Sequence, residues 1–570
     1  RVGIPRTQGS MSPPRRTPAL TIFARCVCLL AIAARRGEAW SAAPPAPRSF
    51  RLARSSPPSP PSRLAASAAA GRDAADAASG VIPYDWREQW YALTYADHVP
   101  DPSESAEVVP ASVFGRPLVL WRGADGGPVR CADDVCPHRS AALSEGRLRD
   151  GNVECYYHGW QFSGDEGGRC VSIPQLEEGV PPPRSACLRM RECRTVEGVV
   201  WAWMGDGDPD RDPPAQGDGL EDIDPATGRH PEYVVNDFQI DLPYDHSFLV
   251  ENLLDPAHIP ISHDGTPGGG KRENAQAYEM TVDPDSVGPG GFRGRYRTAA
   301  QRDAGGPFVD VVFEAPGTIR QKGRPRGDDS DFRFGAALHC MPLSLGRSRL
   351  LFRAYFTGLP PLLKFLISAK PKFLQNLNSC KILEQDAGLI TTQEDHFART
   401  GRRVKDDYTL LSTSDVFVGA YRRWLDGVGH GMPWFQGLAT ARSPSDVAGV
   451  DVGGRPPNPA LDPANHRAGG VRETRYHRHV RNCPATRRAL ARVRSGRRVA
   501  TVLAVASASF GLLSAAPGAP APGRAAARFA AALLPASALA AAGLGRLERR
   551  FYVSFERTRD QLRGESGLDK

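Results

Sequence analysis

Two short stretches decide the fold of the first half of the chain: CPHR at residues 136–139 and CYYHGW at residues 155–160. Each stretch presents one cysteine and one histidine from a loop that Pro or Gly interrupts. Two Cys and two His can hold either a zinc ion or a [2Fe–2S] cluster in which imidazoles ligate one iron. Zinc sites usually pair like with like, whereas here each loop supplies one ligand of each kind, as a cluster requires. The predicted cluster ligands are Cys136, His138, Cys155 and His158.

A second metal pattern follows in ENLLDPAHIPISH at residues 251–263. Two His and one carboxylate, with open positions for O2, form the metal site of non-haem Fe(II) oxygenases. Asp255 and His258 are three residues apart, so they lie on one face of a helix. His258 and His263 are five apart and would diverge by about 140° on a regular helix. Pro260 breaks the helix between them, which lets both imidazoles reach one Fe(II) ion.

The surroundings of the first pattern, with GRCVSIPQ at residues 168–175, resemble the Rieske domains of ring-hydroxylating oxygenases. The second pattern resembles the mononuclear iron site of the same enzymes. A plastid-type leader, the block ENLLDPAH and an apolar C-terminal hairpin followed by FYV at 551–553 are together similar to the pheophorbide a oxygenase family. The resemblance implies an α+β protein, in which an all-β Rieske domain precedes a helix-grip-like catalytic domain and a C-terminal transmembrane helical hairpin.

The resemblance also implies that the third iron ligand is a carboxylate far downstream, on a helix that we expect near residues 371–396. In the family this ligand lies in a segment of Glu-Gln-Asp type, which points to Asp386. Glu384, Glu394 and Asp395 remain alternatives, since any of these acids could instead be a solvated side chain of the helix.

Asp255 takes a separate catalytic role by the same resemblance. In these oxygenases electrons cross between subunits through a His–Asp–His bridge, in which the Asp is the partner of an iron-ligating imidazole. His138 or His158 of one chain would therefore face Asp255 of the next. This arrangement implies a ring-like homo-oligomer, expected to be a homotrimer.

Composition changes along the chain predict its domain organisation. Short apolar runs between Gly, Pro and Asp over residues 89–204 indicate a small all-β domain, and residues 205–228 have the composition of a linker. Residues 232–440 mix strand-like runs with two helices, expected near 244–259 and 371–396. The predicted units are a leader at 1–80, the Rieske domain at 84–210, the catalytic domain at 228–440, a loose linker at 441–495, the hairpin at 496–550 and a tail at 551–570.

The basic character of the chain comes from its first residues. Residues 1–72 hold twelve Arg, no Lys and the single acid Glu38, a charge of +11 against +9 for the whole chain, so the remainder carries −2. We therefore expect no nucleic-acid partner. A basic start, a short apolar run and an acid-free stretch rich in Pro, Ser and Ala are typical of a signal peptide followed by a transit peptide. The alternative is a disordered linker.

Two uncharged stretches near the C-terminus, Val499–Gly523 and Phe529–Gly545, predict the membrane hairpin. Arg residues flank both stretches, and basic outer flanks place the body and the C-terminus on one side of the membrane. A pair of Ala-rich buried helices is the alternative. Before the hairpin, the family carries a Cys-x-x-Cys pair, whereas this chain has Cys483 and Thr486. Control through a disulfide at this place is therefore in doubt.

The resemblance implies a plastid membrane oxygenase, in the inner envelope or the thylakoid. Its electrons would come from reduced ferredoxin, its oxidant would be O2, and its substrate would be a chlorophyll-derived tetrapyrrole: pheophorbide a, chlorophyllide a or protochlorophyllide a. The alternative is a non-catalytic redox subunit of a chloroplast envelope translocon-type complex. The intact pair His258 and His263 favours the enzyme, because a scaffold has no need of an O2 site. The leader and tail disfavour a bacterial-style aromatic-ring oxygenase.

Overall fold

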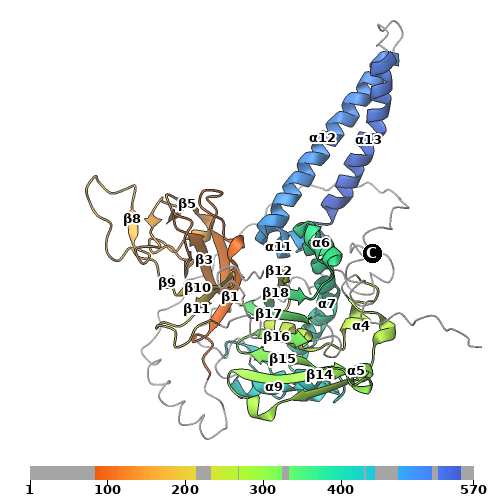
Figure 1. The fold of residues 1–570 in the computed structure, drawn as a ribbon. Helices are drawn as coiled ribbons and strands as arrows, with labels where there is room; N and C mark the ends of the chain where they lie inside the picture. Colours follow the sequence, from red (N-terminus) through yellow and green to blue (C-terminus); the bar gives the residue numbers. More distant parts are fainter. Residues whose placement is uncertain are drawn as a thin grey trace, which may run out of the picture. The chain divides into compact units, whose positions relative to one another are not determined.

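A computed structural model describes residues 84–213, 233–266, 269–323, 333–428, 432–442, 473–515 and 524–553 (Figure 1). The predicted leader at 1–80, most of the linker expected at 205–228 and the end of the predicted tail lie outside the described residues.

The first part of the described chain is built from short antiparallel strands, as predicted for a Rieske domain. Its core is a cluster of buried apolar side chains that includes Val119, Trp121 and Phe162. One sheet has the order β1 (Trp90–Tyr95), β11 (Val199–Trp203), β10 (Cys193–Val196). A second has the order β2 (Val109–Val113), β3 (Arg116–Arg122), β4 (Val129–Asp133), β9 (Met190–Arg191). A third has the order β5 (Arg147–Arg149), β6 (Asn152–Glu154), β7 (Gln161–Phe162), β8 (Cys170–Ser172).

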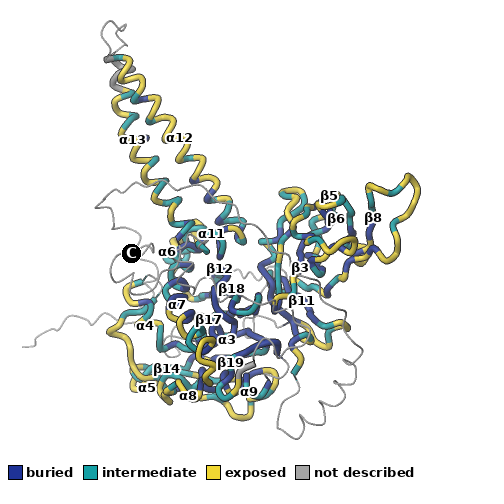
Figure 2. The backbone as a smooth tube through the Cα atoms, turned by 180° about the vertical axis from the view of Figure 1, so that it is seen from behind, coloured by how far each residue is buried: buried dark blue, intermediate teal, exposed yellow. Residues whose placement is uncertain are grey.

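A seven-stranded antiparallel sheet forms the centre of the second part. Its order is β12 (Val234–Leu242), β18 (Arg347–Thr357), β17 (Arg333–Ser344), β16 (Thr318–Gly323), β15 (Val309–Glu314), β14 (Gly291–Thr298), β13 (Tyr278–Val282). Most residues of β17 and β18 are buried in continuous runs, and Figure 2 shows these strands in the buried interior of this part. Hydrogen bonds from Phe114 N to Pro342 O (2.7 Å) and from Gly115 N to Leu343 O (2.8 Å) join the two parts.

Two helices next to this sheet correspond to the two that the sequence predicts. Helix α3 (His246–Leu254) begins where Asp245 accepts a hydrogen bond from Ser247 N, an N-cap that satisfies a free donor. Helix α7 (Lys372–Thr400) ends at Gly401, whose φ of 63° terminates the helix in the left-handed region. The other α-helices described in this part are α4 (Ile259–Ser262), α5 (Ala299–Asp303), α6 (Pro361–Ala369), α8 (Val404–Asp407) and α9 (Val416–Val428).

The C-terminal hairpin consists of α12 (Pro484–Ala515) and α13 (Arg524–Arg549), which lie side by side (Figure 1). Both helices are long and apolar enough to cross a membrane by length and composition. The paired helices are largely exposed in their outer parts (Figure 2). The expectation of two buried Ala-rich helices does not fit this exposure.

The prediction of a loose linker over 441–495 is wrong from residue 473 onward. Helix α11 (Arg475–Arg478) buries its basic side chains because Glu384 of α7 accepts hydrogen bonds from Arg475 Nη2 (2.6 Å) and Arg478 Nη2 (2.8 Å). Helix α12 therefore begins at Pro484 instead of near 496. Residues 443–472 lie outside the described residues.

The predicted tail also begins inside the folded body. Phe551 is fully buried and stacks on Phe373 of α7, with ring centroids 6.1 Å apart. Val553 O accepts a hydrogen bond from Arg475 N at 2.7 Å. We call residues 473–494 and 550–553 the hairpin root, because both chain segments that lead into the hairpin pack here on α7.

Thr486, which replaces the second Cys of the family pattern, lies within the root. Its hydroxyl contacts Cys483 Sγ at 3.4 Å, and Asn376 Nδ2 reaches both side chains, at 3.0 Å from Thr486 Oγ1 and 3.4 Å from Cys483 Sγ. Cys483 is a free thiol. A hydroxyl therefore occupies the place where a disulfide partner would stand.

Candidate metal centres

The two loops of the first pattern have the same local geometry. They follow β4 and β6, and in each the carbonyl of the Cys accepts a hydrogen bond from the backbone N–H four residues later, Ser140 or Gly159, at 2.9 Å. Ser140 and Gly159 have φ values of 56° and 75°. The left-handed residue turns each chain back on itself, so each loop presents its Cys and its His toward the other loop.

The side chains of these loops divide into a buried thiol pair and an outer imidazole pair. Cys136 and Cys155 are each 2% exposed, whereas His138 lies at the surface. The rings of His138 and His158 meet edge to face with centroids 4.6 Å apart, and Trp160 stacks on His138 at 4.3 Å. Burial raises the pKa of the Cys136 thiol to about 11. A thiol in this environment becomes a thiolate when a bound cation supplies positive charge.

The separation of the two pairs distinguishes a cluster from zinc. Among the residues that the structure describes, the one set of three or more His, Cys, Asp or Glu ligand atoms within 4.8 Å of one another belongs to the second pattern. The four atoms of the Cys136/His138 and Cys155/His158 loops are spread more widely. Ligands of a single tetrahedral ion converge, whereas two thiolates on one iron and two imidazoles on another stay apart. The donor set and its spread fit a [2Fe–2S] group.

The second pattern brings three predicted ligands together. His258, His263 and Asp386 offer ligand atoms within 4.8 Å of one another, and His263 and Asp386 are buried. Asp386 Oδ2 lies 3.2 Å from His263 Nε2 and 3.7 Å from His258 Nε2. The sequence prediction of a break at Pro260 is wrong, because α3 ends at Leu254 and Asp255 is already extended. Pro260 lies in the first turn of the short helix α4, where proline is tolerated, and α4 runs from His258 at its N-cap to His263 at its C-cap. Asp386 comes from the middle of α7.

Three observations test whether these side chains fit a metal ion. Asp386 Oδ1 is buried without a hydrogen-bond partner, an arrangement that costs free energy unless a cation compensates it. His263 Nδ1 lies 3.0 Å from Gln385 Oε1, and Gln385 Nε2 donates to Thr266 Oγ1 at 2.9 Å. This orientation makes Gln385 an acceptor, so His263 Nδ1 carries the proton and Nε2 presents a lone pair. The three side chains therefore fit a 2-His-1-carboxylate iron site.

Asp255 lies beside the triad at the C-terminal end of α3. Its Oδ1 accepts a hydrogen bond from Ala257 N at 2.7 Å, and its Oδ2 lies 3.5 Å from His258 Nδ1. Burial lowers the pKa of His258, but Asp255 and Asp386 outweigh burial and raise it above the ordinary value. The carboxylate thus orients His258 from the side opposite Nε2. The Asp255 side chain is one quarter exposed, so it reaches the surface.

The alternative carboxylates of α7 lie outside this group. Both oxygens of Glu384 are held by Arg475 and Arg478 of the hairpin root, and Asp395 pairs with Arg399 at 2.8 Å on the exposed face of the helix. Glu394 likewise does not belong to the set of converging ligand atoms within the described chain. Of the acids considered on α7, Asp386 is therefore the one that the fold directs at both imidazoles.

Two supporting residues were missed by sequence reasoning. Gln385 positions His263. The available signal was its place in the chain between Glu384 and Asp386. Neighbouring residues of a helix point in different directions, so the three side chains have different partners. Glu251 is the first residue of the second pattern and is buried against Arg422 and Tyr408, whose hydroxyl donates to Glu251 Oε1 at 3.0 Å. The contact with Arg422 holds α3 against α9. Only the tertiary structure reveals these contacts.

Comparisons with known proteins show which family the chain belongs to. Residues 89–189 match the family described as Rieske [2Fe-2S] domain, and residues 313–403 match pheophorbide a oxygenase. The chain is 36% identical over 412 residues to the chloroplastic protein TIC 55 of Arabidopsis thaliana, covering 71% of this chain and 72% of the relative. It is 28% identical to chlorophyllide a oxygenase of Chlamydomonas reinhardtii (65% of this chain, 50% of the relative).

Pheophorbide a oxygenase of Arabidopsis thaliana is 29% identical over 380 residues, or 62% of this chain and 66% of the relative. All three relatives are named as chloroplastic. The chain therefore belongs to the Rieske non-haem iron oxygenase family, in the group that includes TIC 55 and pheophorbide a oxygenase, and its cofactors are a [2Fe–2S] cluster and a mononuclear iron.

Proposed function

We propose that this protein is a plastid oxygenase that inserts oxygen from O2 into a chlorophyll-derived tetrapyrrole, with reduced ferredoxin as the electron donor. The observation that carries the proposal is the convergence of His258, His263 and Asp386, because this triad leaves positions open for O2 on one ion. Relatives named pheophorbide a oxygenase and chlorophyllide a oxygenase support the substrate class. The candidate substrates are pheophorbide a, chlorophyllide a and protochlorophyllide a.

The residues are assigned as follows in this proposal. Cys136 and Cys155 ligate the inner iron of the cluster, and His138 and His158 ligate the outer one, as their burial and exposure suggest. His258, His263 and Asp386 hold the mononuclear iron. When bound, the cluster supplies single electrons and the mononuclear iron activates O2.

The protein's own side chains keep these ligands in the state that metal binding requires. Gln385 Oε1 accepts a hydrogen bond from His263 Nδ1, and Asp255 faces His258 Nδ1, so both Nε2 atoms stay directed at Asp386. The low exposure of His263 and Asp386 excludes bulk water from the carboxylate side of the site. Exclusion of water strengthens the electrostatic interactions within the site.

We further propose that the working form is a homotrimer in which His138 or His158 of one chain faces Asp255 of the next. The support from this chain is accessibility, since His138 is exposed and the Asp255 carboxylate reaches the surface. Tyr156 and Tyr157, which are 69% and 60% exposed beside the imidazole pair, supply apolar surface for such a contact.

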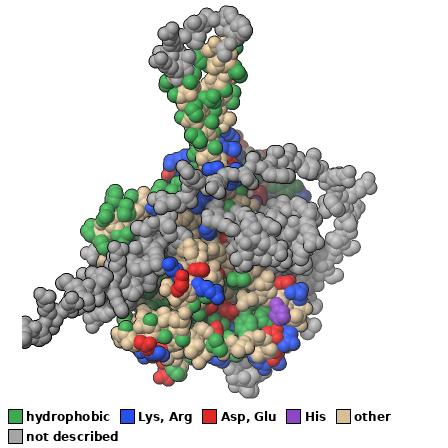
Figure 3. All heavy atoms as spheres, turned by 90° about the vertical axis from the view of Figure 1, so that its right-hand side faces the viewer, with side chains coloured by type: hydrophobic (Ala, Val, Ile, Leu, Met, Phe, Trp, Pro, Cys, Tyr) green, Lys and Arg blue, Asp and Glu red, His purple; other side chains and the backbone are tan. Residues whose placement is uncertain are grey.

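The hairpin is proposed to anchor the protein in a plastid membrane, the inner envelope or the thylakoid. Val502, Leu512 and Leu539 are 66–75% exposed on its outer part, where water would be unfavourable. Lys and Arg gather at its base, below the mainly apolar outer part (Figure 3). A tetrapyrrole is large and apolar, so an enzyme held at the bilayer meets its substrate where it concentrates.

The second candidate function is a non-catalytic redox subunit of an envelope translocon-type complex. The observation that favours it is the identity of 34–36% to two proteins named TIC 55, which exceeds the identity to the two oxygenases named above. The complete triad favours catalysis, because an electron carrier needs no second iron site.

Turnover with isotopic oxygen distinguishes the two functions. The reconstituted protein is incubated with reduced ferredoxin, ¹⁸O2 and each of the three pigments, and the products are analysed by mass spectrometry. The proposed enzyme transfers ¹⁸O to one pigment, and His263→Ala, which removes one ligand, abolishes the label. If the wild type has its iron loaded and reducible yet every pigment stays unlabelled, the tetrapyrrole assignment is wrong.

A further inference from the structure

Helix α6 presents its apolar side chains outward. Leu362, Phe365 and Leu366 are 71%, 66% and 49% exposed, and their spacing of three and four residues places them on one face. A surface helix of a globular protein usually turns this face to the core. A contiguous exposed apolar face of this kind marks a contact with a partner or a membrane.

The position of α6 is set by the hairpin root. Lys370 directly follows α6, and its pKa is lowered by burial and by the nearby positive charge of Arg550, which follows α13. Arg550 Nη2 also contacts Asn378 Oδ1 of α7 at 3.4 Å, and Phe373 stacks on Phe551. The turn between α6 and α7 is therefore packed against the place where α13 returns to the body (Figure 1).

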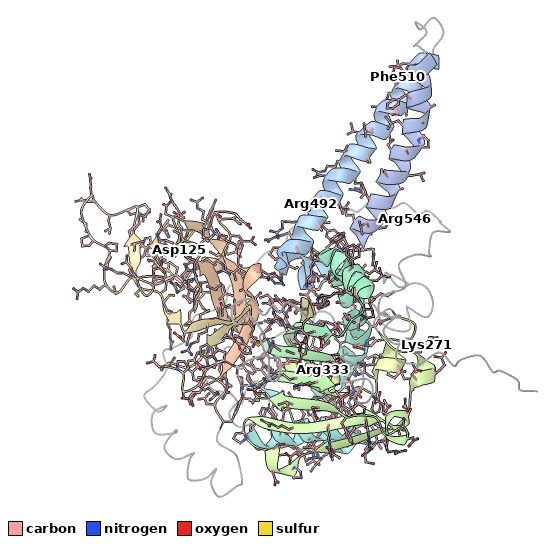
Figure 4. The ribbon with its side chains drawn as sticks, viewed as in Figure 1. Asp125, Lys271, Arg333, Arg492, Phe510 and Arg546 are labelled. Carbon is pink, nitrogen blue, oxygen red and sulfur yellow. The ribbon has the colours of Figure 1, made fainter. Side chains whose placement is uncertain are left out.

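The ion pairs and the exposed apolar residues of the hairpin show how far α6 lies from the level at which a bilayer surface would begin. Glu548 pairs with Arg494 and Arg497, each at 3.0 Å, so the end of α13 is level with these residues of α12. Arg492 and Arg546 lie in the lower part of the hairpin, and Phe510 lies near its far end (Figure 4). The exposed apolar run of α12 begins at Val499, about one to two turns beyond the level of Arg550.

We propose that α6 is a second membrane contact, which lies in the interface of the same leaflet that the hairpin enters. Its apolar face, Leu362, Phe365 and Leu366, is buried among the upper acyl chains, as in helices that lie parallel to a membrane surface. The occupant of this face is a lipid bilayer, because the face adjoins a hairpin whose outer part is apolar and whose base is basic. Arg residues at that level match anionic headgroups.

This inference rests on the membrane hairpin of the proposed function, and lipid photocrosslinking separates the two. Full-length protein is reconstituted into vesicles of phosphatidylcholine and phosphatidylglycerol whose acyl chains carry a diazirine. After illumination, lipid-bearing peptides are mapped by mass spectrometry. We expect label on residues 499–513 of the hairpin and on 361–369 of α6. The peptide that contains Leu411 serves as the unlabelled reference.

Leu411 is a matched reference because it is 54% exposed and lies at the other edge of the catalytic sheet. Thr413, two residues on, accepts a hydrogen bond from Tyr278 N of the edge strand β13, whereas α6 contacts the opposite edge strand β12. The triple variant Leu362→Ser/Phe365→Ser/Leu366→Ser is expected to lose the label on α6 to the Leu411 level and to keep it on the hairpin. Leu411→Ser should change neither.

Each outcome decides the question. Label on the hairpin with none on wild-type α6 overturns the inference and leaves the anchor in place. Absence of label on the hairpin itself refutes the membrane anchor of the proposed function. The wild-type map needs no variant, so misfolding of the triple variant, checked by its cluster spectrum, does not affect the result.

Discussion

Glu384 offers the sharpest test of how the hairpin root supports the iron site. Its carboxylate accepts three hydrogen bonds from Arg475 and Arg478, at 2.6, 2.8 and 3.1 Å, and all three side chains are at most 1% exposed. Glu384→Gln removes the negative charge of the carboxylate and leaves two buried guanidinium groups without a counter-ion. Breaking a buried ion pair from one side costs about 3–5 kcal/mol.

The matched control lies on the same helix. Asp395 pairs with Arg399 at 2.8 Å, but the two side chains are 35% and 67% exposed. Exposed pairs contribute about 0–1 kcal/mol, so Asp395→Asn should leave stability almost unchanged. Pulse proteolysis of the holoprotein in detergent measures the difference, and a loss of 3–5 kcal/mol raises the cleavable population by about 10²- to 10⁴-fold.

The pH dependence supplies an independent check. Burial raises the pKa of Glu384, but Arg475 and Arg478 outweigh burial and hold it below the ordinary value of 4.5. The folded protein therefore keeps the carboxylate ionised when the unfolded chain protonates it. This contribution to stability is complete above pH 4.5 and is lost as pH falls through the lower folded pKa. The Glu384→Gln variant should not show this loss of folding stability at acid pH.

The iron content of two variants shows whether Glu384 or Asp386 is the ligand of the mononuclear iron. We expect Glu384→Gln to retain the mononuclear iron, because its carboxylate faces the root, whereas Asp386→Asn should lose it. If Glu384→Gln lost the iron at unchanged stability, Glu384 would be the ligand and the assignment of Asp386 would be refuted.

Other side chains give separable outcomes. His263→Ala should abolish product and leave the cluster spectrum unchanged, because the centres lie in different domains; a lost cluster signal would contradict that division. Cys155→Ser should remove labile sulfide and the rhombic signal of the reduced cluster, and stoichiometric zinc without sulfide in the wild type would end the cluster assignment. Asp255→Asn should keep both metals and slow single-turnover reduction of the mononuclear iron, so a wild-type rate would count against the bridge. Replacing residues 503–541 by a short Gly/Ser turn should release the protein from membranes with both iron centres intact, since Phe551 and the rest of the root remain; carbonate extraction of the wild type would show that the hairpin is no anchor.

Local spacing was sufficient to predict the two metal patterns. The Cys and His pairs lie within loops of a few residues. The helix break expected at Pro260 lies instead at Asp255, and Pro260 occupies the first turn of α4, where proline is tolerated. Asp386 is more than 120 residues from His263, so only the family resemblance pointed to it. Gln385 was not predicted, since its contact with His263 depends on how α7 packs.

The hairpin root could not be predicted for a physical reason. An Arg-rich stretch beside Gly and Pro has the composition of a solvated linker, and polarity is normally a sign of exposure. Arg475 and Arg478 are buried because Glu384, about ninety residues earlier, supplies the compensating charge. A pairing over that distance leaves no local pattern, so the folded residues from 473 onward, including the start of α12 at Pro484, were expected to belong to a loose linker.

Helix α7 connects the C-terminal hairpin, the proposed membrane anchor, to the iron site without an intervening linker. Phe373 and Leu377 pack against the root, Glu384 is paired with it, and Asp386 follows two residues later at the metal centre. A rigid helix transmits the position of one end to the other, so the orientation of the hairpin and the position of the carboxylate are determined together. An anchor that only tethered the enzyme would need no such packing. The direct attachment therefore favours an enzyme whose catalytic domain is held at a defined height and angle above the bilayer, as a substrate that arrives from the membrane would require.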